Sequence, residues 1–294
     1  MLKKTTLHLR LLPLALLTSL LLSACASIGL ADKPAPPPAK AKIGLALGGG
    51  AARGFAHIGV IKMLEAHGIQ PDYVVGTSAG AVVGSLYAAG YDAFAMQKIG
   101  QQLDEKIFAD WTLSSRGLLK GEALQDFINQ QIARRPLEKL GKPFAAVATD
   151  LNSGERVVFR TGDTGMAVRA SAAVPGVFQP TQFRGKSYVD GGLTSPVPVQ
   201  AARDMGADIV IAVDISAKPE GQPTDSLTAI LWQTTTIMGG AIASNELKSA
   251  DVVIRPKLPY VKSWDFNARN EAMLEGERAA LAALPAIKQK LVRQ

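Results

Sequence analysis

The stretch that decides the fold is residues 72–90, DYVVGTSAGAVVGSLYAAG. The apolar run 73–75 predicts a strand, and the small and apolar residues after Ser78 predict a helix. Ser78 therefore stands at a strand-to-helix junction, between Gly76 and Gly80, in the order G-x-S-x-G. Such a turn is where hydrolases expose a nucleophilic serine. The same pattern also fits a tight turn whose serine caps the helix, so these residues alone leave both interpretations open.

Outward from this junction, short apolar runs alternate with helical patterns. The alternation predicts an α/β fold, a mostly parallel central sheet flanked by helices in three layers, α/β/α. Strands are expected at Ile43–Leu47, 73–75, 144–151, 155–160, 187–190, 207–215 and 250–256, the third and fourth as a hairpin through Asn152, Ser153 and Gly154. Helices are expected at 54–68, after Ser78, within 92–133 and at 268–292, where Pro285 predicts a kink.

The helical region 92–133 carries two apolar stripes with an irregular stretch between them. The stripes are Met96, Ile99, Leu103 and Ile107, then Leu124, Phe127, Ile128 and Ile132. The stretch 108–122 reads FADWTLSSRGLLKGE, and we expect it to expose Trp111, Leu113, Leu118 and Leu119. It is either a packed loop or a flap over an apolar site.

Composition and charge narrow the class of protein. The chain has 294 residues, 47% of them hydrophobic, enough for one large α/β domain or two small ones. Its formal net charge is +7, and Lys3, Lys4 and Arg10 account for three of these charges, which leaves +4 for the remainder. No dense Lys/Arg run is present, so the sequence does not predict a nucleic-acid partner.

The first 24 residues are typical of a signal peptide, with a basic start, a leucine-rich stretch and small residues. Cys25 follows Leu22, Ser23 and Ala24 and is the single cysteine of the chain. This arrangement predicts a bacterial lipobox, with cleavage before Cys25 and lipidation of its thiol. The alternative is an incidental cysteine in a cleaved leader, and in either case the mature domain has no disulfide or thiolate metal site.

The segment after the signal peptide predicts a tether to a membrane. Residues 25–42 contain four prolines with alanine and lysine, a composition that suits an extended linker between a lipidated Cys25 and a domain over 43–294. Ala26, rather than an aspartate, follows the cysteine. We therefore expect a lipid-anchored protein of the bacterial cell envelope, in the outer membrane facing the periplasm.

A glycine loop at residues 48–54, GGGAARG, lies between the first predicted strand and helix. Glycines there let several N–H groups point at one spot, beside the positive end of a helix, and such a loop binds an anion. The anion could be a nucleotide phosphate or a developing oxyanion. The dinucleotide pattern G-x-G-x-x-G fails, because the sixth residue from Gly48 is Arg53 and the third from Gly49 is Ala51.

A nucleophilic serine needs a base, and the histidines do not supply one in the usual order. The three histidines are His8, His57 and His67, and none follows Ser78, which excludes the order serine, acid, histidine. We expect His57 to pack under the glycine loop and His67 to lie near a helix end. The best base is then a carboxylate, Asp190, which ends an apolar strand at the edge where α/β sheets build their sites. An Asp-Gly-Gly turn taken alone would more often be only a turn.

Taken together, these motifs resemble the patatin-like phospholipase family, as a single domain of that kind. The resemblance covers residues 42–215 and rests on LALGGGAARGFAHIGV, VVGTSAGAVVGSLYAAG, RASAAVPGVF and VDGG. It implies a catalytic dyad of Ser78 and Asp190, and an oxyanion hole formed by Gly49, Gly50, Ala51 and Arg53. It also implies that Gly76, Gly80, Gly191 and Gly192 are motif residues, and that fatty-acyl esters of lipids or phospholipids are hydrolysed without metal or cofactor.

One departure from the family and two other functions stay open at this stage. Ala51 stands where the family often has a glycine, so it is either strained by a positive φ or in an ordinary turn position. Arg53 either steadies the loop or attracts a lipid phosphate. The alternative functions are a serine esterase or thioesterase acting on soluble acyl compounds, and a membrane-tethered adaptor with a weakly active hydrolase fold.

Overall fold

The computed structural model describes residues 40–103, 110, 119–220, 224–261 and 265–292. Residues 41–294 form one compact unit, separate from residues 1–40, and the description concerns that unit. The predictions for the signal peptide, Cys25 and most of the tether lie outside the described residues, as do those for Ile107, Trp111, Leu113 and Leu118.

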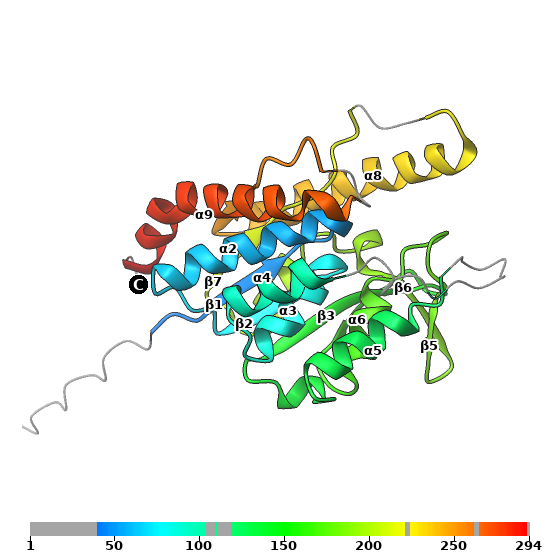
Figure 1. The fold of residues 1–294 in the computed structure, drawn as a ribbon, viewed down its shortest axis with the longest axis horizontal. Coiled ribbons are helices and arrows are strands. Elements are labelled where there is room, and N and C mark those ends of the chain that lie inside the picture. The colour runs from blue at the N-terminus through cyan, green and yellow to red at the C-terminus, as the bar shows by residue number, and fades with distance from the viewer. Residues whose placement is uncertain (1–39, 104–109, 111–118, 221–223, 262–264, 293–294) are drawn as a thin grey trace, which may run out of the picture. The chain divides into compact units, whose positions relative to one another are not determined.

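The described strands form one sheet at the centre of the fold (Figure 1). Its strand order is β5-β6-β3-β2-β1-β7-β8, and β4 pairs with β3 outside this path. The strands are β1 Ile43–Leu47, β2 Tyr73–Thr77, β3 Phe144–Asp150, β4 Arg156–Phe159, β5 Thr181–Phe183, β6 Lys186–Asp190, β7 Ile209–Val213 and β8 Val252–Ile254. The strands from β3 to β8 along this order pair in parallel, whereas β4, β5 and β6 pair antiparallel.

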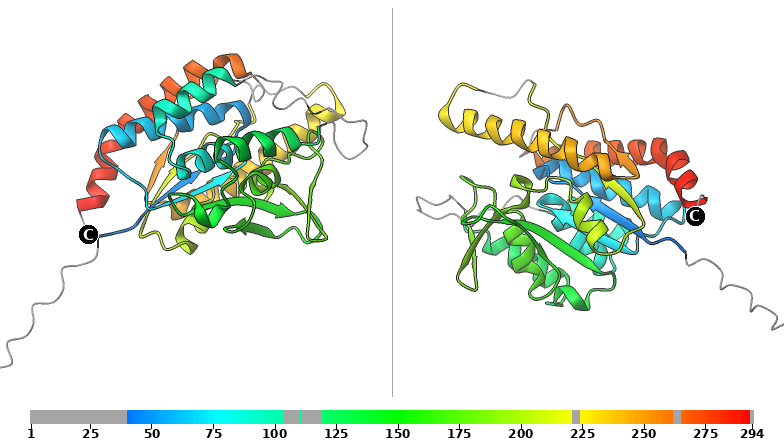
Figure 2. Two further views of the ribbon diagram at one scale, coloured as in Figure 1. Left: turned by 60° about the horizontal axis from the view of Figure 1, so that its bottom comes forward. Right: turned by 180° about the vertical axis from the view of Figure 1, so that it is seen from behind.

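Helices cover both faces of the sheet, which gives the expected three layers (Figure 2). The helices are α2 Phe55–Ala66, α3 Ala79–Ala88, α4 Ala93–Gln102, α5 Glu122–Gln131, α6 Thr164–Ser171, α7 Val199–Asp204, α8 Leu227–Glu246 and α9 Arg269–Val292. The larger core lies between the sheet and α2, α3, α4, α5, α6 and α9. A smaller core on the opposite face joins the sheet to α7 and to the last turns of α8. The class is therefore the α/β fold that the alternating pattern predicts.

The central strands are completely buried because helices cover both of their faces, and their sequences are correspondingly apolar. β1 reads IGLAL and β7 reads IVIAV, with every residue buried. Parallel pairing between them is in register from Ile43 opposite Ile209 to Leu47 opposite Val213. Because the strands end together, the loops that follow them meet at one edge of the sheet.

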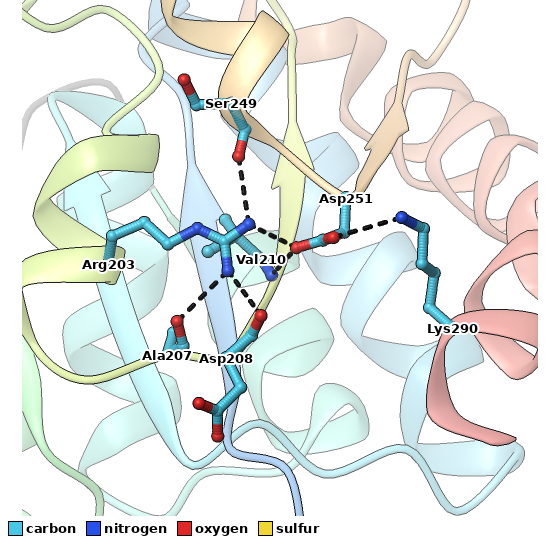
Figure 3. A network of polar contacts seen from close by, with 7 residues as sticks. All are labelled: Arg203, Ala207, Asp208, Val210, Ser249, Asp251 and Lys290. Atoms are coloured by element: carbon cyan, nitrogen blue, oxygen red, sulfur yellow. Dashed lines mark hydrogen bonds and ion pairs between the residues drawn. The ribbon is translucent and has the colours of Figure 1, made fainter. Parts of the chain in front are cut away.

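The opposite, amino-terminal edge of β7 and β8 is closed by polar contacts around Arg203 (Figure 3). Its guanidinium donates hydrogen bonds to the carbonyl oxygens of Ala207, Asp208 and Ser249, and to the Asp251 carboxylate. Asp251 also accepts from the Val210 N–H, at 2.9 Å, and from Lys290 on α9, at 3.3 Å. Burial acts to raise the pKa of Asp251, but these donors outweigh it and lower the pKa.

Most expected elements are present, within a few residues of the expected bounds. The region 92–133 contains two helices, α4 and α5, and α9 continues through Pro285 to Val292. The elements not expected from the sequence are β5, α6, α7 and α8. They are short, except for α8, whose twenty residues mix threonine and glycine with apolar residues.

The expected exposure of Leu119 is wrong. The backbone of Leu119 pairs with Val177 and Gln179 in a short bridge, and its side chain is buried against Phe178 and Ala173. Leu119 therefore belongs to a packed segment, because its bridge to the 177–179 segment turns the leucine side chain toward a small apolar cluster.

Candidate active site

Ser78 occupies the turn between β2 and α3 in a strained backbone conformation, φ 54° and ψ −120°. A non-glycine residue there is uncommon, and this strain characterises the turn that exposes a nucleophilic serine. The two flanking glycines permit it. A Cβ added to Gly76 would lie 2.3 Å from the Gly80 carbonyl oxygen, and a Cβ added to Gly80 would lie 2.1 Å from that of Leu47. Glycine is therefore required at both positions, because neighbouring backbone leaves no room for a side chain.

A second serine, not expected from the sequence, holds this turn in place. The Ser78 N–H donates to the Ser171 hydroxyl oxygen at 2.9 Å, and the Ser171 hydroxyl donates to the Val147 carbonyl oxygen at 2.5 Å. Ser171 is completely buried at the end of α6. No feature of the sequence separated Ser171 from the other small residues of RASAAVPGVF, because its role depends on a neighbour 93 residues away.

Strand pairing brings Asp190 to the same place as Ser78. β2 and β6 lie on either side of β3, where Thr77 is opposite Val147 and Asp190 is opposite Ala148. Ser78, the residue after Thr77, is thus level with Asp190 across one strand. The antiparallel direction of β6 does not prevent this meeting, because its last residue reaches the edge at which β2 ends.

The Asp190 carboxyl group is buried and only half satisfied. Its Oδ1 accepts from the Gly192 N–H at 2.7 Å, at the start of the short turn Gly191–Leu193, while its Oδ2 is buried without a partner in the described part of the chain. Burial raises the pKa of Asp190 to about 6, against the opposing effects of the Ser78 hydroxyl and the Gly192 N–H. Although Ser78 is near enough to lower this pKa, the two side chains form no hydrogen bond of ordinary geometry. Such contacts often tighten only when substrate binds.

The glycine loop offers fewer free donors than the motif suggests. The Gly49 N–H donates to the Pro196 carbonyl oxygen at 2.9 Å, and the Arg53 N–H donates to that of Gly50 at 3.1 Å. Within the described ranges, the N–H groups of Gly50 and Ala51 have no backbone acceptor and line the same cavity as Ser78. They are the donors available to an oxyanion.

Ala51 resolves one of the open alternatives, because its φ is 50°. Alanine in the left-handed region is strained by its Cβ, so the loop carries a conformational cost that a glycine would avoid. The position is not an ordinary turn position.

His57 packs beneath the glycine loop, as expected. Its side chain is completely buried, and its Nε2 lies 2.8 Å from the Gly48 carbonyl oxygen. A carbonyl can only accept, so Nε2 carries the proton and Nδ1 is left buried without a partner among the described residues. Burial lowers the pKa of His57 to about 4, so the ring is neutral at pH 7. The exposed His67 ends α2, also as expected.

Arg53 is the charged residue of the loop, and it is buried with a relative exposure of 6%. Neither a hydrogen bond nor an ion pair of its guanidinium is found within the described residues, and burial lowers its pKa. It lines the cavity that contains Ser78 and Asp190. An arginine so placed has guanidinium donors available to an anion that enters the cavity.

Two cavities meet at Ser78. The larger, about 550 Å³, is lined by the predicted site residues Gly49, Gly50, Ala51, Arg53, Ser78, Asp190 and Gly192. The smaller, about 110 Å³, shares Ala51, Ser78 and Val174 with the first, and is otherwise lined by apolar side chains and small residues, most of them on α2, α3, α4 and α5. Ser78 is thus reached from both cavities, and the charged side chains of the site, Arg53 and Asp190, line the larger one.

Other kinds of site have no support in the described residues. Groups of three or more histidine, cysteine or carboxylate side chains that could hold a metal ion are not found there. Across those same ranges, each helix is too short or too polar to cross a bilayer.

The fold and site define an α/β protein with a strained serine turn, a buried carboxylate and a donor loop. The sequence model of the family described as "Patatin-like phospholipase" matches residues 45–203, more than half of the 294 residues. The chain therefore belongs to the patatin-like phospholipase family.

Known relatives agree with this membership, and a solved structure has a similar fold. An uncharacterized NTE family protein of Mycobacterium tuberculosis is 38% identical over 188 residues, covering 63% of this chain and 52% of the relative. Patatin-like phospholipase domain-containing protein 6 of Homo sapiens is 33% identical over 204 residues, covering 65% of this chain and 15% of that protein. The chain thus spans about half the length of the mycobacterial relative. VipD from Legionella pneumophila has a similar fold, with a TM-score of 0.57 at 15% identity, over 84% of this chain and 67% of VipD.

Proposed function

We propose that the protein hydrolyses fatty-acyl esters of lipids, with Ser78 as nucleophile and Asp190 as general base. The observation that carries this proposal is the buried Oδ2 of Asp190, which has no partner among the described residues, on a residue that lines the same cavity as Ser78. A serine turn alone fits many folds. A buried carboxylate oxygen that has no partner among the described residues costs stability, and such groups are typical of sites where a proton is to be accepted.

The reaction follows from these positions. Ser78 Oγ attacks the ester carbonyl carbon while Asp190 Oδ2 takes its proton, and the Gly50 and Ala51 N–H groups stabilise the oxyanion. As the tetrahedral intermediate collapses, Asp190 returns the proton to the departing alcohol and an acyl-serine remains. Water then repeats the sequence, with Asp190 first accepting and then returning a proton to Ser78. A pKa of about 6 leaves Asp190 ionised at pH 7, yet a stronger base than an exposed aspartate.

The two cavities indicate which part of a lipid lies on which side of Ser78. We assign the acyl chain to the smaller cavity, because its walls are apolar. The alcohol and head group then occupy the larger cavity, where Arg53 is free to bind a phosphate. This arrangement favours a phospholipid over a soluble ester, and it favours phosphate binding over a purely structural role for Arg53.

The proposal is tested by assaying the full-length protein on a panel of phospholipids, lysophospholipids, neutral lipid esters, and short-chain esters and thioesters. We expect long-chain lipid esters to give the highest kcat/KM, with Ser78→Ala at background on every substrate. A preference for short soluble esters or thioesters would replace the lipid assignment with the soluble esterase. If wild type neither reacts with a fluorophosphonate probe nor turns over any substrate, the membrane-tethered adaptor is the remaining function.

The acyl assignment has its own test on α3. Ser78, Val82 and Leu86 all line the smaller cavity at steps of four residues, about 6 Å apart along the helix. Val82→Phe should therefore shift the preferred acyl chain to shorter lengths, and Leu86→Phe should do so less. An unchanged chain-length profile in a folded Val82→Phe protein would remove the acyl chain from this cavity.

We also propose that Cys25 is lipidated and anchors the protein in the bacterial outer membrane, facing the periplasm. The support is the signal-like leader and the small residues before Cys25. Cys25→Ser should release the protein from tight membrane attachment in fractionated cells. Wild type found wholly in the soluble fraction would contradict the anchor.

A further inference from the structure

The helix α8 presents a row of large apolar side chains to solvent. Leu227 is 73% exposed, Leu231 58% and Met238 59%, and Ile230 and Ile237 are about half exposed. These residues lie three, four, ten and eleven positions from Leu227, so they share one face of the helix. We call these five residues the α8 apolar face. Single exposed leucines are common, but a row of this length on one helix is not.

The α8 apolar face has no charged residue that would oppose its transfer from water to an apolar environment. The helix has no Asp, Glu, Lys or Arg between Leu227 and Asn245, and its other polar residues are threonine, glutamine and serine. A surface that contacts hydrocarbon has this composition, because threonine and glutamine are far cheaper to bring into an apolar environment than charged residues.

The helix is attached to the protein mainly at its carboxyl-terminal end. Ala243 is the fully buried residue among the α8 side chains that the structure describes. Glu246 accepts hydrogen bonds from the Ser195 hydroxyl at 2.5 Å and from the Val197 N–H at 3.1 Å. The amino-terminal half, drawn in yellow, stands apart from the sheet (Figures 1 and 2). Internal packing therefore does not account for the apolar residues of this half.

The α8 apolar face continues into the catalytic cavity. Leu231, Trp232 and Gly239 line the larger cavity together with Ser78 and Asp190. A Cβ added to Gly239 would lie 3.9 Å from the Gly192 carbonyl oxygen, which places this part of α8 beside the turn that follows Asp190. A molecule that covers the face is thus also at the mouth of the site.

We propose that the α8 apolar face is the surface with which the protein contacts a lipid bilayer, and that it opens the catalytic cavity toward that bilayer. The inference rests on the proposed lipid hydrolysis, and it adds the means by which an insoluble substrate reaches Ser78. The apolar side chains insert at the level of the head groups, and a lipid moves from the bilayer along Leu231 into the cavity. A second copy of the chain or a protein partner is the competing occupant.

The test measures binding and turnover in full-length protein carrying Cys25→Ser, so that a lipid anchor does not dominate. The variant is Ile230→Asp/Ile237→Asp, because neither residue lines a described cavity. Leu281→Asp is the matched control, an exposed leucine on α9. Flotation with phosphatidylcholine vesicles uses an additional Ser78→Ala change, so that binding is measured without catalysis.

We expect the double variant to lose at least tenfold in vesicle binding and in turnover of vesicle phospholipid, while turnover of a soluble short-chain ester stays within twofold of the parent. Leu281→Asp should match the parent in all three measurements. Binding of the parent should be nearly independent of salt, because the face carries no charge. Turnover of the soluble ester depends on the dyad but not on bilayer contact. A variant that loses vesicle turnover and keeps ester turnover therefore has an intact dyad and a defect in bilayer contact.

Three results would overturn the proposal. Unchanged vesicle binding in the double variant would place the bilayer contact elsewhere. A parent that is a dimer by light scattering, and becomes monomeric in the double variant without a change in vesicle binding, would make the face an interface between copies. Equal loss of soluble-ester turnover in a protein with an unchanged melting curve would make α8 a wall of the site and not a bilayer contact.

Discussion

Two arginines at opposite edges of the sheet differ in how many hydrogen bonds and ion pairs their guanidinium groups form. At the amino-terminal edge, Arg203 meets three carbonyl oxygens and the Asp251 carboxylate (Figure 3). At the carboxyl-terminal edge, Arg53 is more deeply buried and has no hydrogen-bond or ion-pair partner within the described ranges. Arg203 therefore joins parts of the fold to one another, whereas Arg53 lines the cavity that contains Ser78 and Asp190.

The same contrast applies to the carboxylates and the backbone. Asp251 has donors on both of its oxygens, but Asp190 has one buried oxygen for which the described part of the chain supplies no partner. Ser78 and Ala51, both at the carboxyl-terminal edge, have positive φ values of 54° and 50°. Unsatisfied groups and strained residues cost stability, and Ala51, Ser78 and Asp190 all line one cavity at this edge, which fits an edge shaped for substrate.

The first prediction concerns removal of Arg203, whose hydrogen bonds stabilise the amino-terminal edge of the sheet. Arg203→Met should lower the free energy of unfolding by about 3 kcal/mol, because four hydrogen bonds are lost and Asp251 keeps only part of its set. Its kcat should stay near that of wild type. Urea denaturation measures the loss, with Arg156→Met as control. Arg156 pairs with Asp204 at the surface, so its loss should cost less than about 1 kcal/mol. Equal losses in the two variants would contradict the contrast.

The second prediction concerns His57, which supports the loop at the unsatisfied edge. Its pKa is lowered from 6.5 to about 4 in the folded protein, so the unfolded chain binds the extra proton first as the pH falls. Stability should therefore decline from about pH 6.5 toward pH 4, by about 3 kcal/mol from this residue. His57→Gln should remove that part of the decline in melting curves taken across this range, and should keep kcat within tenfold. A folded variant with a thousandfold loss would make His57 the base.

The third prediction is a gain in the free energy of unfolding, opposite in sign to the loss expected for Arg203→Met. Arg53→Met should raise the free energy of unfolding by about 2 kcal/mol, because a buried charge that has no partner among the described residues is replaced by an apolar side chain. Hydrolysis of a phospholipid should fall relative to that of a neutral ester of the same acyl chain. Denaturation and a two-substrate comparison measure the two effects. A loss of stability like that of Arg203→Met would show that Arg53 is a structural residue.

The smallest effect is expected at Ala51. Ala51→Gly should raise the free energy of unfolding by about 1 kcal/mol, since glycine removes the strain of the positive φ at some cost in unfolded-state entropy. Ala133→Gly, at a φ of 54° away from the site, is a matched control and should give a similar gain. No gain at either position would contradict the assigned strain.

The sequence predicted those parts of the fold and site that depend on local pattern. Apolar runs located β1, β2 and β7, and the glycines around Ser78 and in the loop at residues 48–54 located the turns, because backbone geometry there admits little else. The exclusion of histidine predicts Asp190 as the base, although its pairing level beside β3 leaves no local signal. Its meeting with Ser78 is a consequence of strand order.

The remaining features depend on neighbours distant in the chain. Ser171 holds the N–H of Ser78 from 93 residues away, and Gly49 loses its free N–H to Pro196. Neither interaction leaves a local signal. The helix α8 was missed because its threonines and glycines break the usual helical pattern, and its exposed apolar face belongs to no internal core.

The most direct test of the central claim, that stability is given up at Asp190 for catalysis, is a paired measurement on Asp190→Asn. An aspartate whose pKa rises from 3.8 to about 6 on folding destabilises the protein by about 3 kcal/mol above pH 6, and not at all below pH 3.8. Asp190→Asn should therefore be more stable than wild type at pH 8 by up to this amount, with the gain vanishing near pH 4. In the same protein kcat/KM should be at least a hundredfold lower than in wild type. In wild type, kcat/KM should decrease as the pH is lowered, with a midpoint near pH 6, because Asp190 becomes protonated. An Asp190→Asn protein that keeps its activity, or that is less stable than wild type at pH 8, would contradict the account.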